Sequence, residues 1–159
     1  MKRLVPILRL MATAVLGFLT GCSNRSTGVD LGADDPEMAT AVAKARATLP
    51  DYWQLFEHPE HGESDFSLKV EVSDKHGTEH FWVVDPQRKD GKIFGTVDND
   101  PELVKNVKAG DRIQVDEQAI SDWGYVRDGK MHGKYTLRVL MKHMPAKEAE
   151  MYGQILADP

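Results

Sequence analysis

The chain has 159 residues, with 20 Lys and Arg against 25 Asp and Glu and a formal charge of −5. This acidic balance argues against nucleic acid as a partner, which needs a basic surface, and against electrostatic attachment to anionic lipids. The length suits one domain once a targeting segment is removed. Cys22 is the single cysteine, so the chain cannot form an intramolecular disulfide.

Residues 1–21 have the parts of a bacterial export signal. Lys2-Arg3 precedes an uninterrupted apolar stretch over 10–19, and these ten residues are fewer than the ~20 that span a bilayer. The sequence LTGC that ends at Cys22 resembles the lipobox of bacterial lipoproteins, in which the signal is cut before the cysteine and the thiol is acylated. We therefore predict that Cys22 is the lipidated N-terminus of the mature protein.

The residues after Cys22 predict how the protein is held in the envelope. More than one lipid chain is needed for stable anchoring, and the resemblance implies a diacylglycerol plus an amide-linked acyl chain. Ser23 stands where Asp is the inner-membrane retention signal of that family, which favours the outer membrane in a host with two membranes. Residues 22–33 are small and polar and predict a flexible tether, so we expect a periplasm-facing domain over 34–159.

The domain is predicted to open with two helices and a loop. Asp34-Asp35-Pro36-Glu37 has the acidic cap and early proline of a helix start, and apolar residues keep helical spacing until Pro50. Residues 51–56 predict a short second helix. His58 and His61 follow in a loop without a third or fourth ligand nearby, so we expect no metal and no cofactor.

The middle of the chain predicts strands. Apolar and polar residues alternate from Phe66 to Ser73, and the expected partner strands and their connections follow in order. These are strands at 79–84, 92–97 and 112–115, a short helix at 101–108, and a weaker helix after Pro145. The pattern predicts one α+β domain, an antiparallel sheet of about six strands with flanking helices.

Residues 120–140 predict a β-hairpin that turns at Asp128-Gly129, because a type I′ turn needs positive φ at both positions. Counting outward pairs Arg127 with Lys130 and places successive side chains on opposite faces. One face is assigned to the core and carries Ile120, Val126, Met131, Leu137 and Val139. The other carries a candidate binding patch: Trp123, Tyr125, His132, Lys134 and Arg138.

Two interpretations of this patch stay open. The rings can simply cover the sheet, with Lys134 over Trp123 as a cation–π pair. Alternatively the patch binds a partner, because Trp, Tyr and Arg are enriched at recognition hot spots. A bulge at Gly124 or Gly133 would exchange the two faces on one side of it.

No sequence motif of a known enzyme class is present, but three polar residues lie in strand-like segments. His80 and Asp122 could do acid–base chemistry if the fold brings them within hydrogen-bond reach. Such residues, Arg138 included, are more often satisfied structural groups. The alternatives are therefore a non-enzymatic envelope module that binds a protein or glycan, and a small hydrolase or isomerase that uses His80 and Asp122.

The chain contains, in this order, the segments ATLPDYWQLF, FSLKVEV, EHFWV, GTVDNDPELVKNVKAGDRI and ISDWGYVRDGKMHGKYTLRVL. Their most characteristic pieces are Glu79-His80-Phe81-Trp82, Asn99-Asp100-Pro101 and Ser121-Asp122-Trp123. In order and spacing these segments resemble the YegJ-like family, a bacterial domain of unknown function (the one numbered 2314), and the resemblance covers roughly residues 39–140. The family has no established activity, so the resemblance supports the fold and leaves the function open.

Overall fold

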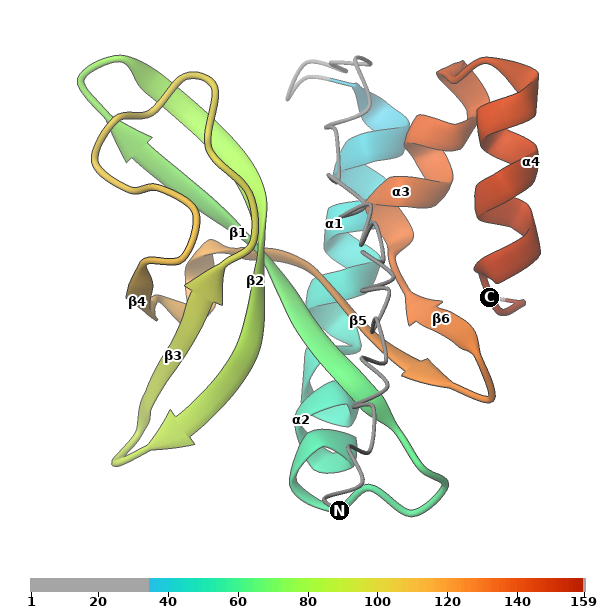
Figure 1. Cartoon of the computed structure of the whole chain (residues 1–159), viewed down its shortest axis with the longest axis horizontal. Coiled ribbons are helices and arrows are strands. Elements are labelled where there is room, and N and C mark those ends of the chain that lie inside the picture. Colours follow the sequence, from blue (N-terminus) through green and yellow to red (C-terminus); the bar gives the residue numbers. More distant parts are fainter. Residues whose placement is uncertain (1–34, 159) are drawn as a thin grey trace, which may run out of the picture.

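Six antiparallel strands make up the centre of the molecule, in the order β4-β3-β2-β1-β5-β6 (Figure 1). The computed structural model describes residues 35–158. The strands are β1 (Ser64–Asp74), β2 (Gly77–Lys89), β3 (Lys92–Val97), β4 (Arg112–Val115), β5 (Ile120–Arg127) and β6 (Lys130–Gly133). The predicted class, a single α+β domain on one antiparallel sheet, is confirmed.

Four helices flank the sheet (Figure 1). They are α1 (Pro36–Ala47), α2 (Leu49–Glu57), α3 (Tyr135–Leu140) and α4 (Ala146–Ile155), with short 3₁₀ turns at Glu117–Ala119 and Met141–His143. The Asp35 carboxylate caps α1 by accepting from the backbone N–H groups of Glu37 and Met38, both at 2.9 Å. Pro50 lies in the first turn of α2, so the first helix ends two residues earlier than predicted. None of the helices in residues 35–158 is long and apolar enough to cross a membrane.

An aromatic cluster fills the space between the helices and one face of the sheet. Tyr52 of α2 is 1% exposed, and its ring centroid lies 5.0 Å from Trp53, 5.7 Å from Phe66 and 5.4 Å from Trp123. Burial raises the pKa of the Tyr52 phenol. Leu68, Val70, Phe81 and Val83 supply the aliphatic and aromatic side of this core from β1 and β2. The residues that alternate with them point to the opposite side of the sheet, which we call the polar face.

The segment between β3 and β4 is an irregular loop, so the helix predicted at 101–108 is wrong. Carboxylates from the neighbouring β1–β2 hairpin bind its backbone instead. Glu79 accepts from the N–H groups of Glu102, Leu103 and Val104, at 2.9, 2.8 and 3.3 Å. Asp74 accepts from the N–H of Lys105 at 2.7 Å. These long-range acceptors satisfy the donors that a helix would have used, and the loop lies against the β1–β2 hairpin (Figure 1).

The predicted hairpin forms around Asp128-Gly129, with Arg127 opposite Lys130 and Gly124 opposite Gly133. Its return strand, however, ends at Gly133, and the residues predicted to extend it to Leu140 form α3. The backbone leaves the strand at Lys134, whose φ of 52° lies in the left-handed region. The cause is again a distant carboxylate, because Asp122 accepts from the N–H groups of Tyr135 and Thr136 and so caps the helix.

The expectation that Trp123 and Tyr125 are exposed is wrong. They are 7% and 9% exposed and lie in the aromatic cluster. Ile120, predicted to face the other way, is 1% exposed on the same side. The reason is an irregularity in the β1–β5 pairing, where Lys69 pairs with Asp122 but Val70 pairs with Ile120. The extra residue, Ser121, reverses the alternation, so the bulge lies outside the two glycines considered from the sequence.

Candidate functional site

The polar face carries a group of charged and hydroxyl side chains from three neighbouring strands. Lys69 of β1 pairs across the sheet with Trp82 of β2 on one side and Asp122 of β5 on the other. Ser67 lies two residues before Lys69, on the same face of β1. Lys134 and Thr136 reach the group from the start of α3. The full set, which we call the lysine site, is Ser67, Lys69, Trp82, Asp122, Lys134 and Thr136.

Lys134 crosses the polar face above Trp82. Its ammonium nitrogen lies 3.1 Å from the centroid of the indole ring and donates to Ser67 Oγ at 3.1 Å. The predicted cation–π pair therefore forms with Trp82 and not with Trp123. Gly124 lies beneath the aliphatic part of this side chain, and a Cβ there would lie 2.5 Å from Lys134 Cε. Burial lowers the pKa of Lys134 to about 8, against the opposing effects of Asp122 and Asp98.

Lys69 is the second ammonium group of the site. Its Nζ donates to Thr136 Oγ1 at 3.3 Å, and that hydroxyl in turn donates to Asp122 Oδ2 at 2.7 Å. Burial lowers the pKa of Lys69, and the Asp122 charge opposes the shift. Among residues 35–158, neither Lys69 nor Lys134 forms an ion pair with a carboxylate. Both ammonium groups are instead held by neutral hydroxyls.

Asp122 is completely buried, and both of its carboxylate oxygens accept hydrogen bonds from within the fold. Its two carboxylate oxygens accept from the N–H groups of Trp123, Tyr135 and Thr136 and from the Thr136 hydroxyl, at 2.7 to 3.1 Å. Burial raises the pKa of Asp122, while the hydrogen bonds from Thr136 and Trp123 oppose that shift. Four donors on two oxygens match the ionised form, because a protonated carboxyl would need an acceptor in place of one of them.

The structure does not join His80 to Asp122. His80 Nδ1 lies 3.0 Å from Ser121 Oγ, and Nε2 lies 3.6 Å from a carboxylate oxygen of Glu71. Burial lowers the pKa of His80, assisted by the Lys69 charge. Since the described partners of Asp122 are backbone N–H groups and the Thr136 hydroxyl, it serves as a helix cap. The acid–base pair considered from the sequence is absent from the described structure.

The candidate patch divides among different parts of the molecule. The His132 ring stacks on Tyr125, with centroids 4.9 Å apart, and burial lowers the pKa of His132. Arg138 donates to the carbonyl oxygens of Gly133 and Ala157, which ties α3 to the chain after α4. Lys134 alone of the five predicted residues belongs to the lysine site.

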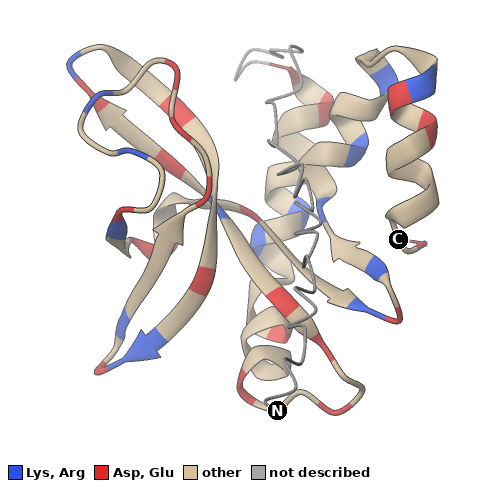
Figure 2. Cartoon of the chain, in the orientation of Figure 1, with Lys and Arg blue, Asp and Glu red and all other residues tan. Residues whose placement is uncertain are grey.

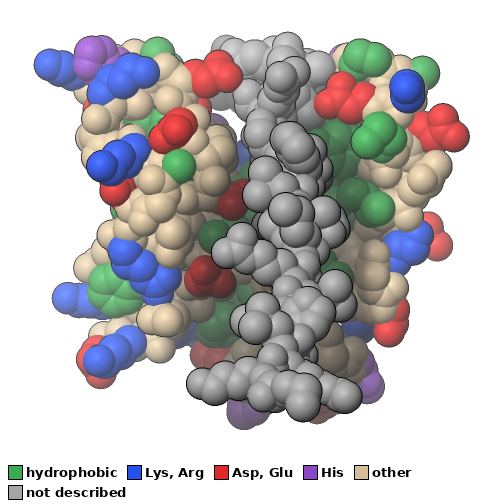
Figure 3. Space-filling view, viewed as in Figure 1, with side chains coloured by type: hydrophobic (Ala, Val, Ile, Leu, Met, Phe, Trp, Pro, Cys, Tyr) green, Lys and Arg blue, Asp and Glu red, His purple; other side chains and the backbone are tan. Residues whose placement is uncertain are grey.

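Charges of both signs are spread over the rest of the molecule. Basic residues stand out at the tip of the β2–β3 hairpin (Figure 2), which carries Arg88, Lys89 and Lys92. In the space-filling view, charged side chains are interspersed on the side of β2–β4, and hydrophobic ones show more on the helical side (Figure 3).

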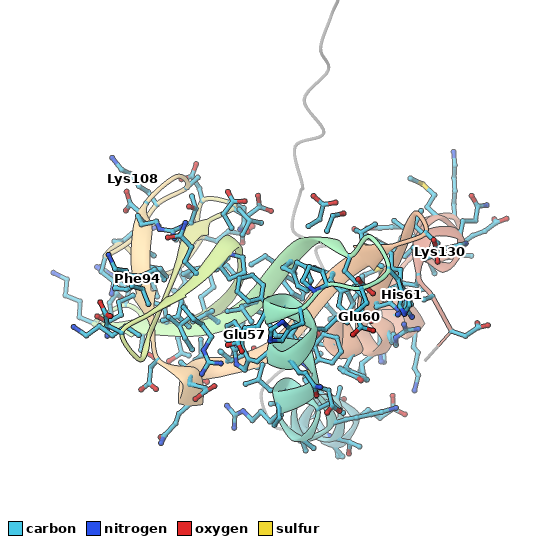
Figure 4. The ribbon with its side chains drawn as sticks, turned by 90° about the horizontal axis from the view of Figure 1, so that it is seen from below. Glu57, Glu60, His61, Phe94, Lys108 and Lys130 are labelled. Carbon is cyan, nitrogen blue, oxygen red and sulfur yellow. The ribbon has the colours of Figure 1, made fainter. Side chains whose placement is uncertain are left out.

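His61 and Glu60 lie on the loop between α2 and β1 (Figure 4). Residues 35–158 contain no group of three or more His, Cys, Asp or Glu side chains placed to hold a metal ion. Cys22 and the predicted tether lie outside the described residues, so their assignment stays a prediction.

Comparison with known proteins gives the family. The family model described as "Uncharacterized protein conserved in bacteria (DUF2314)" matches residues 35–157. The chain belongs to this family. It is 31% identical over 150 residues to the uncharacterized protein YegJ of Escherichia coli K12, which covers 94% of this chain and 95% of YegJ.

A second relative is a putative ankyrin repeat protein of Neisseria meningitidis serogroup B. It is 31% identical over 124 residues, which cover 73% of this chain and 49% of that protein. No solved structure matches the chain. The predicted YegJ-like family is therefore confirmed. The description of the family gives no activity that could be assigned to its members.

Sequence reasoning found Lys134 and Asp122 but missed the other members of the lysine site. The alternation put Lys69 and Ser67 on the face opposite Leu68, which is correct, but it also predicted that this face is exposed to water. Ser67 is instead buried, at 5% exposed, and Lys69 is half-buried. Nothing in the alternation indicated which residues of other segments cover them. The four-residue piece Glu79-His80-Phe81-Trp82 contained the one available signal. There Phe81 faces the core, which puts Trp82 on the polar face.

Proposed function

We propose that this chain is an envelope-anchored lipoprotein whose domain is a non-enzymatic binding module. The lipobox at Cys22 supports the anchor, with the outer membrane favoured in a host with two membranes and the domain facing the periplasm. The partner is an envelope protein or glycan, which the module binds through the polar face. The proposed surface replaces the Trp123–Tyr125 patch, because both rings are buried.

One observation carries this proposal. The lysine site places two ammonium groups beside a tryptophan, and each is held by a neutral hydroxyl and has no ion-pair partner among the described residues. Lys69 and Lys134 are half-buried. Withdrawing a cation from water without a paired anion is costly to a fold, so such groups are candidates for a functional site. The rim of the site is accessible, since the side chains of His80 and Glu71 are 36% and 46% exposed.

The hydrolase or isomerase alternative finds less support. It needed His80 and Asp122 as a pair, and each has other partners. A substrate would also have to compete with four donors for the Asp122 carboxylate. Binding makes no such demand, because the ammonium groups keep donors that the hydroxyls do not use.

Photo-crosslinking in living cells tests the proposal. A benzophenone amino acid replaces Glu71, which lies on the rim two residues from Lys69, in the full-length chain. We expect a discrete adduct that disappears in the Lys69→Met, Lys134→Met double variant. The adduct should persist in Lys92→Met, which removes one positive charge at the tip of the β2–β3 hairpin. An adduct that survives the double variant would assign partner binding to another surface.

A further inference from the structure

We infer that the lysine site takes a carboxylate, supplied by an acidic side chain of a protein partner, which binds between the Lys69 and Lys134 ammonium groups. This inference rests on the proposed function and names the chemistry of its ligand. It starts from the charges that the fold leaves unbalanced. Lys69 and Lys134 are opposed by one fully buried carboxylate, that of Asp122.

Asp122 cannot act as a close counter-ion for both lysines. Its oxygens already hold three backbone N–H groups and the Thr136 hydroxyl, and Lys69 reaches it only through that hydroxyl. The other acidic group that acts on Lys134 is Asp98, which is exposed to solvent. The site therefore sets two half-buried positive charges, those of Lys69 and Lys134, against one fully buried negative charge, that of Asp122. A single added negative charge would balance these three groups.

This balance favours a monoanion over a dianion. A carboxylate brings one charge and two oxygens, which suits two ammonium donors on either side. A phosphate group brings close to two negative charges at neutral pH, which would give the two lysines, Asp122 and the ligand together a net negative charge. The exposed Glu71 on the rim, which faces His80, also disfavours a second negative charge.

The tryptophan of the site argues for a peptide rather than a sugar. Sugar rings that bind proteins through aromatic residues need a free ring face to pack on. Here Lys134 occupies a face of the Trp82 indole at 3.1 Å from its centroid. The ring therefore orients the ammonium group through a cation–π contact, and the ligand meets the cation and not the ring.

The test follows the lysine ¹³Cε signals by NMR in the full-length chain, labelled with ¹³C-lysine and purified in detergent. Lys134→Arg, Lys69→Arg and Lys92→Arg assign the signals. The probes are N-acetyl-glutamate amide, its neutral isostere N-acetyl-glutamine amide, glucuronate and inorganic phosphate. We expect the glutamate derivative to shift the Lys69 and Lys134 signals in a saturable way, and the glutamine derivative to leave them unchanged. Lys134→Met should weaken this binding about tenfold or more, as for loss of a charged hydrogen bond.

The pH profile separates this site from the basic hairpin tip. Charged groups that act on Lys134 are Asp122, Asp98 and Lys69. Burial also lowers the pKa of Lys69. Affinity for the glutamate derivative should fall as pH rises through about 8, and should fall less in Lys134→Arg, which stays protonated. The Lys92 signal should not respond to the probe at any pH.

Each other outcome overturns a defined part of the inference. Tighter binding of glucuronate would replace the peptide by an acidic glycan, and tighter binding of phosphate would refute the monoanion. Equal shifts at Lys92 would show general attraction of anions to surface lysines. If no probe binds while the Glu71 adduct still depends on Lys69 and Lys134, the carboxylate assignment fails and the proposed binding function stands.

Discussion

Trp123 and Trp82 stand on opposite faces of the same sheet, and their surroundings predict different costs of removal. Trp123 is 7% exposed, contacts Tyr52 and Tyr135, and donates its indole N–H to the carbonyl oxygen of Ala45 at 2.9 Å. Trp123→Ala should therefore reduce the free energy of unfolding by about 3–5 kcal/mol, the range for emptying a core aromatic site. Trp82→Ala, on the polar face, should cost less than half as much in the same denaturant melts. Equal costs would place Trp82 in the core as well.

The Lys134 ammonium predicts how stability depends on pH. Its folded pKa of about 8 lies below the value of an unfolded lysine, ~10.4. Between these two values the unfolded chain binds more protons than the folded one, so stability should rise with pH across that window. Below pH ~8 the full cost of burying the charge is present.

Comparing the full-length chain with Lys134→Met isolates this contribution from other groups that titrate in the same range. The free energy of unfolding of wild type should gain on the order of 2 kcal/mol relative to the variant between pH 8 and 10.4. Denaturant melts at several pH values measure this difference. A difference that stays constant with pH would mean that the Lys134 ammonium is well solvated. Carboxylate binding would raise the pKa of Lys134 in the folded chain, because an anion next to an ammonium group favours its charged form. The pH range over which stability rises would then become narrower.

At the scale of elements, the β3–β4 loop depends on one side chain of β2. Glu79 accepts three consecutive backbone N–H groups of this loop. Glu79→Ala should leave these donors to solvent and speed the hydrogen exchange of the Leu103 and Val104 amides by about tenfold, which corresponds to the loss of one hydrogen bond of ~1.4 kcal/mol. Glu60→Ala, on the exposed α2–β1 loop, is the control and should leave these rates unchanged. Unchanged exchange in Glu79→Ala would mean that the loop is held by its buried Val104 instead.

The elements also show which parts of the fold the sequence could predict. Strand β1 was evident from its alternation, and the β5–β6 turn from Asp128-Gly129, because both signals are local. The predictions failed at residues 101–108, at residues 134–140 and in the faces of β5. In each case a distant partner decides the structure: Glu79 holds the loop, Asp122 caps α3, and the pairing with β1 absorbs Ser121 as an extra residue. The lysine site lies where two of these long-range effects meet, so local patterns could not assemble it.

At the scale of the whole molecule, the proposed anchor and the described domain are separate parts of the chain. The described domain begins at residue 35, where the match to the family model also begins, whereas the predicted anchor lies at Cys22. A flexible tether of the length predicted for residues 22–33 would span on the order of 20 Å. This reach would let the polar face meet proteins close to the membrane surface without the domain itself entering the bilayer.

The anchor gives the last prediction. Cys22→Ser removes the thiol that the acyl chains would occupy, so the variant should stay unprocessed, with its signal segment attached. Mass spectrometry of wild type should show a chain that begins at residue 22 and carries acyl groups, and the variant should lack both features. Because Cys22 precedes the described domain, the variant's domain should melt at the same denaturant concentration as that of wild type. A wild-type protein that is unlipidated and released from membranes would refute the anchor, while leaving the lysine site and its ligand open to the NMR test.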